Sequence, residues 1–268
     1  MPATALTAPA AGVRRSPSRL GILVRQAIAE IKGQLRAPDF AVGVIALPVV
    51  LYMVFGAPRA NEPMPGGTVG AYLVVAFCIY GTLSVVLFGI GQAVADERGR
   101  GYVRLVRTTP LPTSAYLGAK LVLAAVLTVV SVACVGLVGM LTGAGLPLDR
   151  WAATAGVLAL GGLALAPIGF LIGFLVRPSG AGAVSLLLLF PLSLASGVFM
   201  QVDQLPGVVR DISQVTPTYH LAELARSVAG FGVATDPLPH IAWIAAWSLA
   251  GTLVTVLAYR RLVGRQFA

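Results

Sequence analysis

The stretch D-E-R-G-R-G-Y-V-R-L-V-R-T-T-P-L-P, residues 96–112, lies between two of the longest uncharged runs of the chain, residues 63–95 and 121–148. Each run exceeds the roughly 20 apolar residues with which an α-helix crosses about 30 Å of hydrocarbon. A segment this charged is costly to place in lipid. The stretch, called the polar island below, therefore predicts two membrane-spanning helices joined on one side of a membrane.

The composition places the chain among integral membrane proteins. Of its 268 residues, 57% are hydrophobic and 11% are charged, and the mean hydropathy is +0.87; a soluble domain has about 25% charged residues. Backbone groups in lipid must be paired within the segment, and the alternation of barrel strands is absent. We therefore predict an all-α integral membrane protein with a single transmembrane domain, residues 17–268. The six predicted spans are residues 40–58, 69–94, 115–141, 151–176, 183–201 and 239–259.

The positive charges predict the orientation of these spans. Fifteen of the nineteen Lys and Arg residues lie before the first span, between spans two and three, between spans four and five, or after span six. The other side has only Arg59, Arg150, Arg210 and Arg226. Positive residues favour the cytoplasmic side, so both termini and the polar island are expected there. The net charge of +9 then indicates attraction to membrane lipid and not a nucleic-acid partner.

The segment before the first span predicts an amphipathic helix at residues 18–37, after a disordered cytoplasmic tail at residues 1–16. Such a helix would lie along the membrane interface. A solvated linker helix is the alternative. The apolar face would hold Leu20, Leu23, Ala27, Ile28, Ile31 and Leu35, and the basic face Arg25, Lys32 and Arg36.

The segment between spans five and six predicts two short amphipathic helices on the external side. Apolar residues recur there at helical spacing, from Leu205 onward. The second helix has recognisable ends, because Thr216 can cap it, Pro217 suits its first position and Gly230 can close it. We expect these helices either to dip into the outer leaflet or to cover the bundle.

Two pairs of glycines allow helices to approach closely. Gly169 and Gly173 form a G-x-x-x-G pair on span four, and Gly139 and Gly143 form another near the outer end of span three. Such pairs are common at contacts between membrane helices. Each is therefore a possible contact between two copies of the chain.

The spans contain no acid or base deep in the bilayer, although Lys120 is expected at the inner end of span three. Ion-coupled carriers usually need such a group near the midplane, which disfavours a secondary carrier. A membrane scaffold or enzyme also remains an alternative, but no catalytic motif is present. The phosphate loop of ATPases is absent because the chain has no Gly-Lys dipeptide. We expect no catalytic residue and no ATP hydrolysis by this chain.

Metal binding is also unexpected. His220 and Glu223 could share a helix face, but two ligands are too few for a stable metal site. Cys78 and Cys134 fall within spans two and three and are expected to act as small apolar residues.

In these features the chain resembles the membrane subunits, or permeases, of type-2 ABC exporters. This class includes exporters of drugs, antibiotics, polysaccharides and lipid-linked substrates. The likeness lies in an interfacial helix followed by six spans and in two groups of residues. The polar island matches at Glu97, Arg98, Arg100, Gly101, Leu105, Thr109 and Pro110, and the external segment matches at Ser196–Met200, Leu205, Pro206, Pro217, Tyr219, His220 and Arg226.

The resemblance implies a role for each group. The polar island would form a cytoplasmic coupling helix between spans two and three, which docks in a groove of a separate ATPase. Glu97, Arg98, Arg100 and Gly101 would make the polar contact, Leu105 would pack the element, and Thr109 and Pro110 would end it. Leu205, Pro206, Pro217, Tyr219 and Arg226 would belong to external re-entrant helices.

The resemblance also implies the assembly. Two permeases, identical or related, would work with two ATPase subunits that bind ATP and Mg, so this chain would need no cofactor of its own. It would sit in a bacterial-type cytoplasmic membrane and export a hydrophobic drug-like or lipid-like substrate. Gly99 and Arg104 stand where the family often has acids, which makes the expected docking surface unusually basic. We expect the charged island side chains to be exposed and separate from the core.

Overall fold

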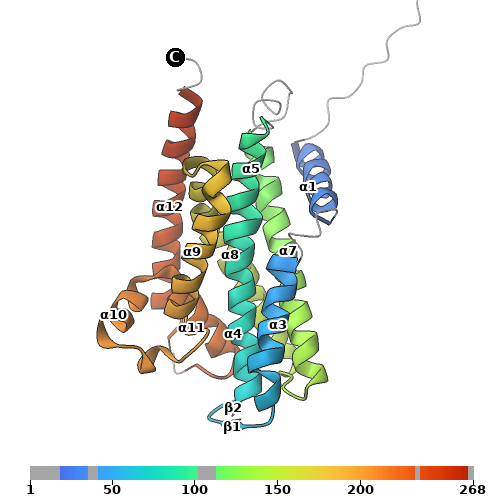
Figure 1. Cartoon of the computed structure of the whole chain (residues 1–268), viewed down its shortest axis with the longest axis vertical. Coiled ribbons are helices and arrows are strands. Elements are labelled where there is room, and N and C mark those ends of the chain that lie inside the picture. Colours follow the sequence, from blue (N-terminus) through green and yellow to red (C-terminus); the bar gives the residue numbers. More distant parts are fainter. Residues whose placement is uncertain (1–18, 36–41, 102–112, 233–235, 265–268) are drawn as a thin grey trace, which may run out of the picture.

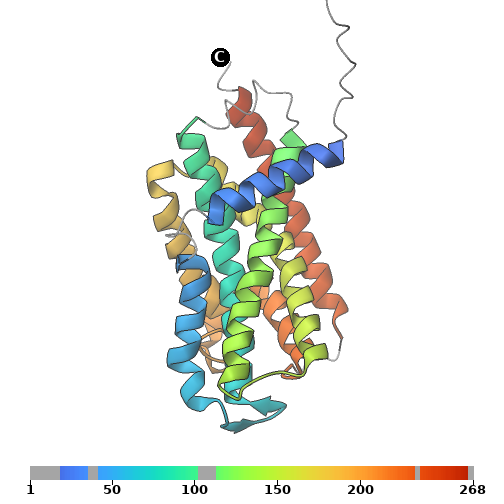
Figure 2. The ribbon, with the colours of Figure 1, turned by 90° about the vertical axis from the view of Figure 1, so that its right-hand side faces the viewer.

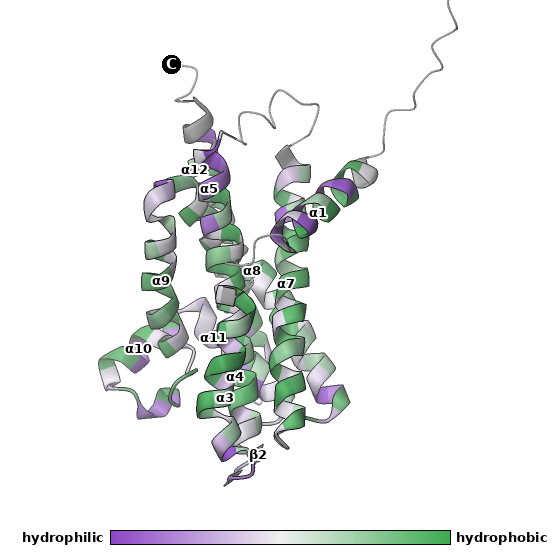
Figure 3. Ribbon diagram, turned by 45° about the vertical axis from the view of Figure 1, so that its right-hand side comes forward, coloured by the Kyte–Doolittle hydropathy of each residue, from purple (hydrophilic) through white to green (hydrophobic). Residues whose placement is uncertain are grey.

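The computed structural model describes residues 19–35, 42–101, 113–232 and 236–264, and it shows a bundle of long helices that lie side by side (Figure 1). Within these described ranges, five helices are long and apolar enough to cross a membrane. Figure 3 shows that these helices are mostly hydrophobic along their length, as expected for an all-α membrane protein. The five helices are Val69–Gly99, Ser114–Leu141, Leu148–Leu175, Pro178–Ala195 and Leu238–Arg260.

The elements follow one another in a simple up-and-down order. The first part contains α1 (Arg19–Leu35), the π-helical segment η1 (Val42–Ala46), α3 (Leu47–Phe55), the 3-10 turn η2 (Ala57–Arg59), and the paired strands β1 (Pro63–Met64) and β2 (Gly67–Thr68). The middle contains α4 (Val69–Ser84), the π-helical segment η3 (Val85–Gln92), α5 (Ala93–Gly99), α7 (Thr113–Leu141) and α8 (Leu148–Leu175). The last part contains α9 (Pro178–Ala195), the 3-10 turn η4 (Val202–Gln204), α10 (Gly207–Val215), α11 (Pro217–Ala229) and α12 (Leu238–Gly264).

The predicted spans match these helices with three differences. The first span, predicted at residues 40–58, is a shorter apolar helix of which Gly43–Phe55 is described. The second does not stop at residue 94 but continues to Gly99, inside the polar island. The fifth begins at Pro178, five residues before the predicted start, because proline suits the first helical turn. It ends at Ala195, and Gly197 then adopts a left-handed conformation with φ of 71°.

The two ends of the bundle differ. The α1 end has α1, the end of α5 and the C-terminal end of α12, and the hairpin end has β1, β2 and α10 (Figure 1). Figure 2 shows that α1 runs obliquely across the bundle near the α1 end. This placement is consistent with the interfacial helix predicted at residues 18–37. The predicted tail, residues 1–16, lies outside the described residues.

The centre of the bundle is the continuous helix formed by α4, η3 and α5. Almost all of its α4 residues are buried, and α8 packs along its η3 part. Gly169 and Gly173 make this approach possible, because an added Cβ would overlap the carbonyl oxygen of Val86 at Gly169 and lie 2.7 Å from Val94 Cβ at Gly173. This G-x-x-x-G pair therefore packs within the chain, and our expectation of a contact between copies there is wrong.

The second glycine pair gives the same result. A Cβ at Gly139 would lie 2.5 Å from Val74 Cγ2, so this glycine packs α7 against α4. Gly143 has φ of 84° and forms the turn after α7. Neither residue of this pair is presented to a second copy by a helix surface, which corrects the expectation for Gly139 and Gly143.

The two predicted helices between spans five and six are confirmed. The Thr216 hydroxyl accepts a hydrogen bond from the Tyr219 amide at 3.3 Å, Pro217 begins α11, and Gly230 ends it with φ of 96°. α11 is inserted among α4, α8 and α12, where Leu221 and Ala225 are buried. α10 instead lies at the rim of the bundle, with Val208 73% exposed and Ile212 61% exposed. The two helices thus have different environments.

Candidate functional site

The polar island begins on the last turn of the central helix and not on a separate element. α5 ends at Gly99, and backbone bonds from Arg100 to the Asp96 carbonyl and from Gly101 to the Arg98 carbonyl, 2.9 Å and 3.1 Å, close the turn. Gly101 has φ of 77°, a conformation that favours glycine. Four of the seven predicted docking residues are described. The remaining three, Leu105, Thr109 and Pro110, lie outside the described residues.

Lys120 on α7 organises the first group of island contacts. Its side chain is 1% exposed, and its ammonium forms ion pairs with Glu30 on α1, at 2.6 Å, and with Glu97 on α5. The Tyr116 hydroxyl donates to the other Glu97 oxygen at 2.6 Å, and Gln26 donates to Glu30 at 3.1 Å. A buried ammonium is very costly unless it is paired and hydrogen-bonded. These residues, called the lysine cluster, therefore hold α1, α5 and α7 together.

Arg98 makes the second group of contacts. Its two terminal nitrogens donate to the carbonyl oxygens of Phe174 and Val176, where α8 ends. The last carbonyls of a helix have no partner within the helix, and a cation there also complements the helix dipole. Arg98 thus joins the end of the central helix to the end of α8.

These contacts correct the expectation that the island side chains are exposed and separate from the core. Glu97 and Arg98 bind partners within the chain, whereas Arg100 is exposed. Sequence reasoning placed Lys120 at the inner end of its span but found neither of its partners. The signal for Glu30 was weak, since it is simply one acid on an amphipathic helix.

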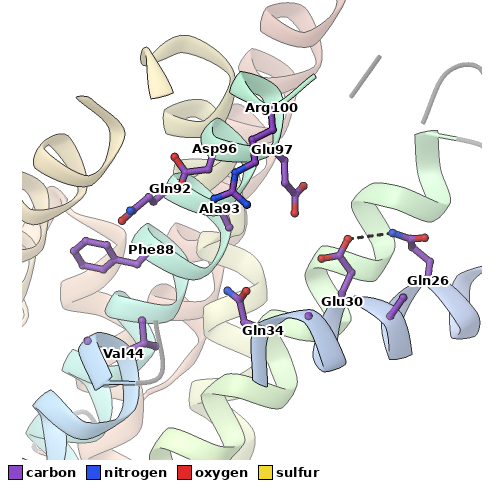
Figure 4. A pocket seen from close by; sticks show the side chains of 13 residues that line it. Gln26, Glu30, Gln34, Val44, Phe88, Gln92, Ala93, Asp96, Glu97 and Arg100 are labelled. Atoms are coloured by element: carbon purple, nitrogen blue, oxygen red, sulfur yellow. Dashed lines mark hydrogen bonds between the residues drawn. The ribbon is translucent and has the colours of Figure 1, made fainter. Parts of the chain in front are cut away.

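A cavity of about 680 Å³ lies beside the lysine cluster, between α1 and the central helix (Figure 4). Its walls come from one side of α1, the start of the first span, and one side of η3 and α5. Phe88 and Val44 form an apolar part, and Asp96, Glu97 and Arg100 form a polar part. Its volume is in the range of small-molecule sites.

At the hairpin end, Arg226 on α11 is a second buried cation, 5% exposed. It donates to the Ser196 carbonyl oxygen at 2.8 Å and to Glu223 at 2.7 Å, and it lies 6.0 Å from the Tyr72 ring. Of the other predicted external residues, Leu205 and Pro217 are buried, Tyr219 is partly buried, and Pro206 is exposed at the start of α10. Arg226 therefore fastens the turn after α9 to α11.

The hydrogen-bond partners of His220 are His240 and Gln214. Its Nδ1 lies 2.9 Å from His240 Nδ1, and its Nε2 lies 2.9 Å from the Gln214 carbonyl oxygen. Within the described ranges, no three His, Cys, Asp or Glu side chains are grouped as metal ligands. Burial is the main cause that lowers the pKa of His220, and the nearby His240 lowers it further.

Comparison with known proteins adds evidence independent of this geometry. The sequence profile of the family described as "ABC-2 family transporter protein" matches residues 27–259. A protein of Bacillus subtilis (strain 168), described as "Putative transport permease YvfS", is 27% identical over 203 residues, which cover 75% of this chain and 82% of that protein. The region matched by the family profile begins within α1 and includes the polar island, α10 and α11.

Proposed function

Because this chain belongs to the ABC-2 family of transporter proteins and is a membrane transport permease, we propose that it is the membrane subunit of an ATP-driven exporter. It supplies the substrate pathway, and a separate ATPase subunit supplies the energy. The sequence supports this division, since it has no phosphate-binding loop. ATP and Mg bind to the ATPase, and two copies of it work with two permeases, identical or related.

The proposed docking site is the polar island, with the α1 end of the bundle in the cytoplasm. Arg100 and Gly101 are at the described edge of this surface, and Leu105, Thr109 and Pro110 belong to its continuation. Both termini are then cytoplasmic, and the distribution of positive residues supports this orientation. The membrane is the cytoplasmic membrane of a bacterial-type cell.

One observation supports the coupling role most strongly: the last turn of the central helix is tied to three other helices. Glu97 binds the Lys120 that also binds Glu30 on α1, and Arg98 binds the end of α8. An ATPase that displaces the island would therefore move the central helix together with α1, α7 and α8. Packed elements of this kind transmit a displacement as a unit and not as a local bend.

The substrate is proposed from the character of the bundle. The long helices are apolar, and the buried cations of the described part lie near the two ends. A hydrophobic drug-like or lipid-like molecule suits such a pathway better than an ion. Leu205, Pro206, Pro217, Tyr219 and Arg226 would then frame the external exit, where α11 enters the bundle.

The test is a charge reversal on the exposed island residue with a matched control. Arg100→Glu and Arg210→Glu each reverse one exposed arginine, the second on α10 at the hairpin end. We expect both variants to insert and fold normally. Arg100→Glu should lower the amount of ATPase subunit that copurifies with the tagged chain by roughly tenfold or more. The substitution places a negative charge on the basic docking surface, and a charge mismatch with the groove of the ATPase is strongly unfavourable.

The control variant should retain its ATPase. Equal recovery of the ATPase with both variants and the unaltered chain would contradict docking at the island. Transport driven by a proton or sodium gradient, with no ATPase present, would contradict the proposed function as a whole and would favour a secondary carrier.

A further inference from the structure

The cavity at the α1 end has a polarity gradient along its length. Phe88, Gln92, Asp96 and Arg100 follow one another at four-residue intervals along the central helix, and all four line the cavity (Figure 4). They extend over roughly 18 Å of helix, from the apolar part of the cavity to its charged part. Such a gradient matches an amphiphile that lies with its head at the charged part and its chain toward Phe88.

Four polar side chains of the wall have no partner among the residues that the structure describes. Asp96, Arg100, Gln34 and Gln92 form no side-chain hydrogen bond or ion pair with any residue in the described ranges. Asp96 and Arg100 lie one helical turn apart and yet make no ion pair with each other. A carboxylate and a guanidinium without partners in these ranges can bind the two opposite charges of a zwitterion.

The described charges at the cavity disfavour an anionic head. Among the described residues, Glu30, Asp96, Glu97 and Arg100 line the cavity, and Lys120 binds two of these carboxylates, so three negative and two positive charges leave one negative charge. Lys120 is already occupied by Glu30 and Glu97, so Asp96 is the carboxylate left for a ligand cation. A head with an ammonium is therefore favoured over one with a phosphate alone.

Two glycines in the wall leave open space in the cavity. A Cβ built at Gly33 on α1, or at Gly43 at the start of the first span, would meet no atom within 4 Å. Both residues line the cavity. Gly33 therefore has room for an added side chain beside the cavity, so a substitution there can narrow the site.

We propose that this cavity binds a zwitterionic amphiphile with a head of the phosphoethanolamine type. The ammonium lies against Asp96, the phosphate against Arg100, and the amides of Gln34 and Gln92 bind the remaining polar atoms. The hydrocarbon chain begins along Phe88 and Val44. The amphiphile is either a resident bilayer lipid or a transported molecule, since both present the same head.

The test measures binding to the purified full chain in detergent, with lysophosphatidylethanolamine as the probe and lysophosphatidylglycerol as the anionic comparison. Binding is followed as an increase in unfolding temperature with probe concentration. We expect the first probe to stabilise the chain at lower concentrations than the second. Asp96→Asn should weaken binding of the first probe roughly tenfold, because one charge-assisted contact is lost.

Gly33→Leu should reduce the stabilisation, because the added side chain takes up part of the cavity beside Gln34. The matched control is Gly156→Leu, which alters an exposed glycine of α8 that also has open space around it. That control should bind like the unaltered chain. Equal stabilisation of both leucine variants, or no preference between the two probes, would overturn the proposal even if Asp96→Asn failed to fold.

Two further measurements distinguish the source of the amphiphile. Phosphatidylethanolamine retained in equimolar amount through purification indicates a resident lipid. ATP-dependent movement of the lyso probe across vesicles that contain the complex indicates a transported one. Binding to the isolated chain requires no ATPase, so a failure here is separate from a failure of the proposed coupling.

Discussion

The two buried cations among the described residues of this membrane protein lie at opposite ends of the bundle and have different kinds of partners. Lys120 pairs with carboxylates from two other elements, which are 90 and 23 residues away in the chain. Arg226 pairs with Glu223 on its own helix, three residues away, and with one backbone carbonyl oxygen. The lysine cluster therefore joins three helices through ion pairs, whereas Arg226 joins α11 to the turn after α9 through one backbone carbonyl oxygen. We expect the ion-paired joint to transmit movement between helices and the contact at the turn to preserve one shape.

The first prediction tests the lysine cluster by replacing Lys120. In Lys120→Met, two carboxylates that are 10% and 23% exposed lose their shared cation. Removing one partner of a buried ion pair costs roughly 3–5 kcal/mol, so we expect a large loss of stability. The measurement is unfolding of the purified chain in detergent. Lys32→Met, on the exposed face of α1, is the control and should have almost no effect. Similar stabilities of these two variants would contradict the assigned role of the cluster.

The second prediction tests the hairpin end. Arg226→Met leaves the Ser196 carbonyl oxygen without this donor and leaves Glu223, which is 20% exposed, without its cation. We expect a smaller loss, about 1–3 kcal/mol, because Glu223 can still be hydrated. Glu223→Gln is the control and should cost less than Arg226→Met, since the bond to Ser196 persists. An Arg226→Met loss larger than that of Lys120→Met would reverse the comparison.

The third prediction is a dependence on pH at the hairpin end. His220 Nε2 donates to the Gln214 carbonyl oxygen, so in the neutral ring Nδ1 accepts from His240. Two protonated rings cannot form this bond. Burial lowers the pKa of His220 in the folded chain, although Gln214 and Glu223 oppose the shift. The unfolded chain then takes up the proton first, so the stabilisation is complete above about pH 6.5 and is lost as the pH falls below it.

The measurement is the unfolding temperature between pH 7.5 and pH 5. We expect a small decrease toward low pH in the unaltered chain and a flatter profile in His220→Phe. The effect should be smaller than that of either cation variant, because both histidines are partly exposed. An identical pH profile for His220→Phe would show that this pair does not contribute.

Features governed by neighbouring residues were predictable from the sequence. The ends of α11 follow from Thr216, Pro217 and Gly230, whose effects are local, and the helix has those ends. The apolar character of the long helices likewise follows from composition. The predicted bounds of span five, residues 183–201, differ from those of α9 because they took no account of Pro178 and Gly197, which set where the helix starts and stops.

Contacts between distant parts of the chain were not predictable in the same way. Nothing near Glu30 in the sequence indicates that it pairs with Lys120, and the pair forms only when α1 crosses the bundle. Arg98 was read as an exposed docking residue because its partners are carbonyl oxygens, which have no signature in a sequence. The cavity was not predictable either, because its walls are segments distant in the sequence that the fold brings together.

The central claim is that the ATPase docks at the α1 end, beside the joint formed by Lys120, and not at the hairpin end. The most direct test places a photoreactive amino acid at Arg100 in one variant and at Arg210 in another, in cells that also contain the ATPase. Both positions are exposed. We predict a covalent adduct with the ATPase subunit from position 100 and none from position 210. An adduct from position 210, or no adduct from position 100 while the ATPase still copurifies, would contradict the account.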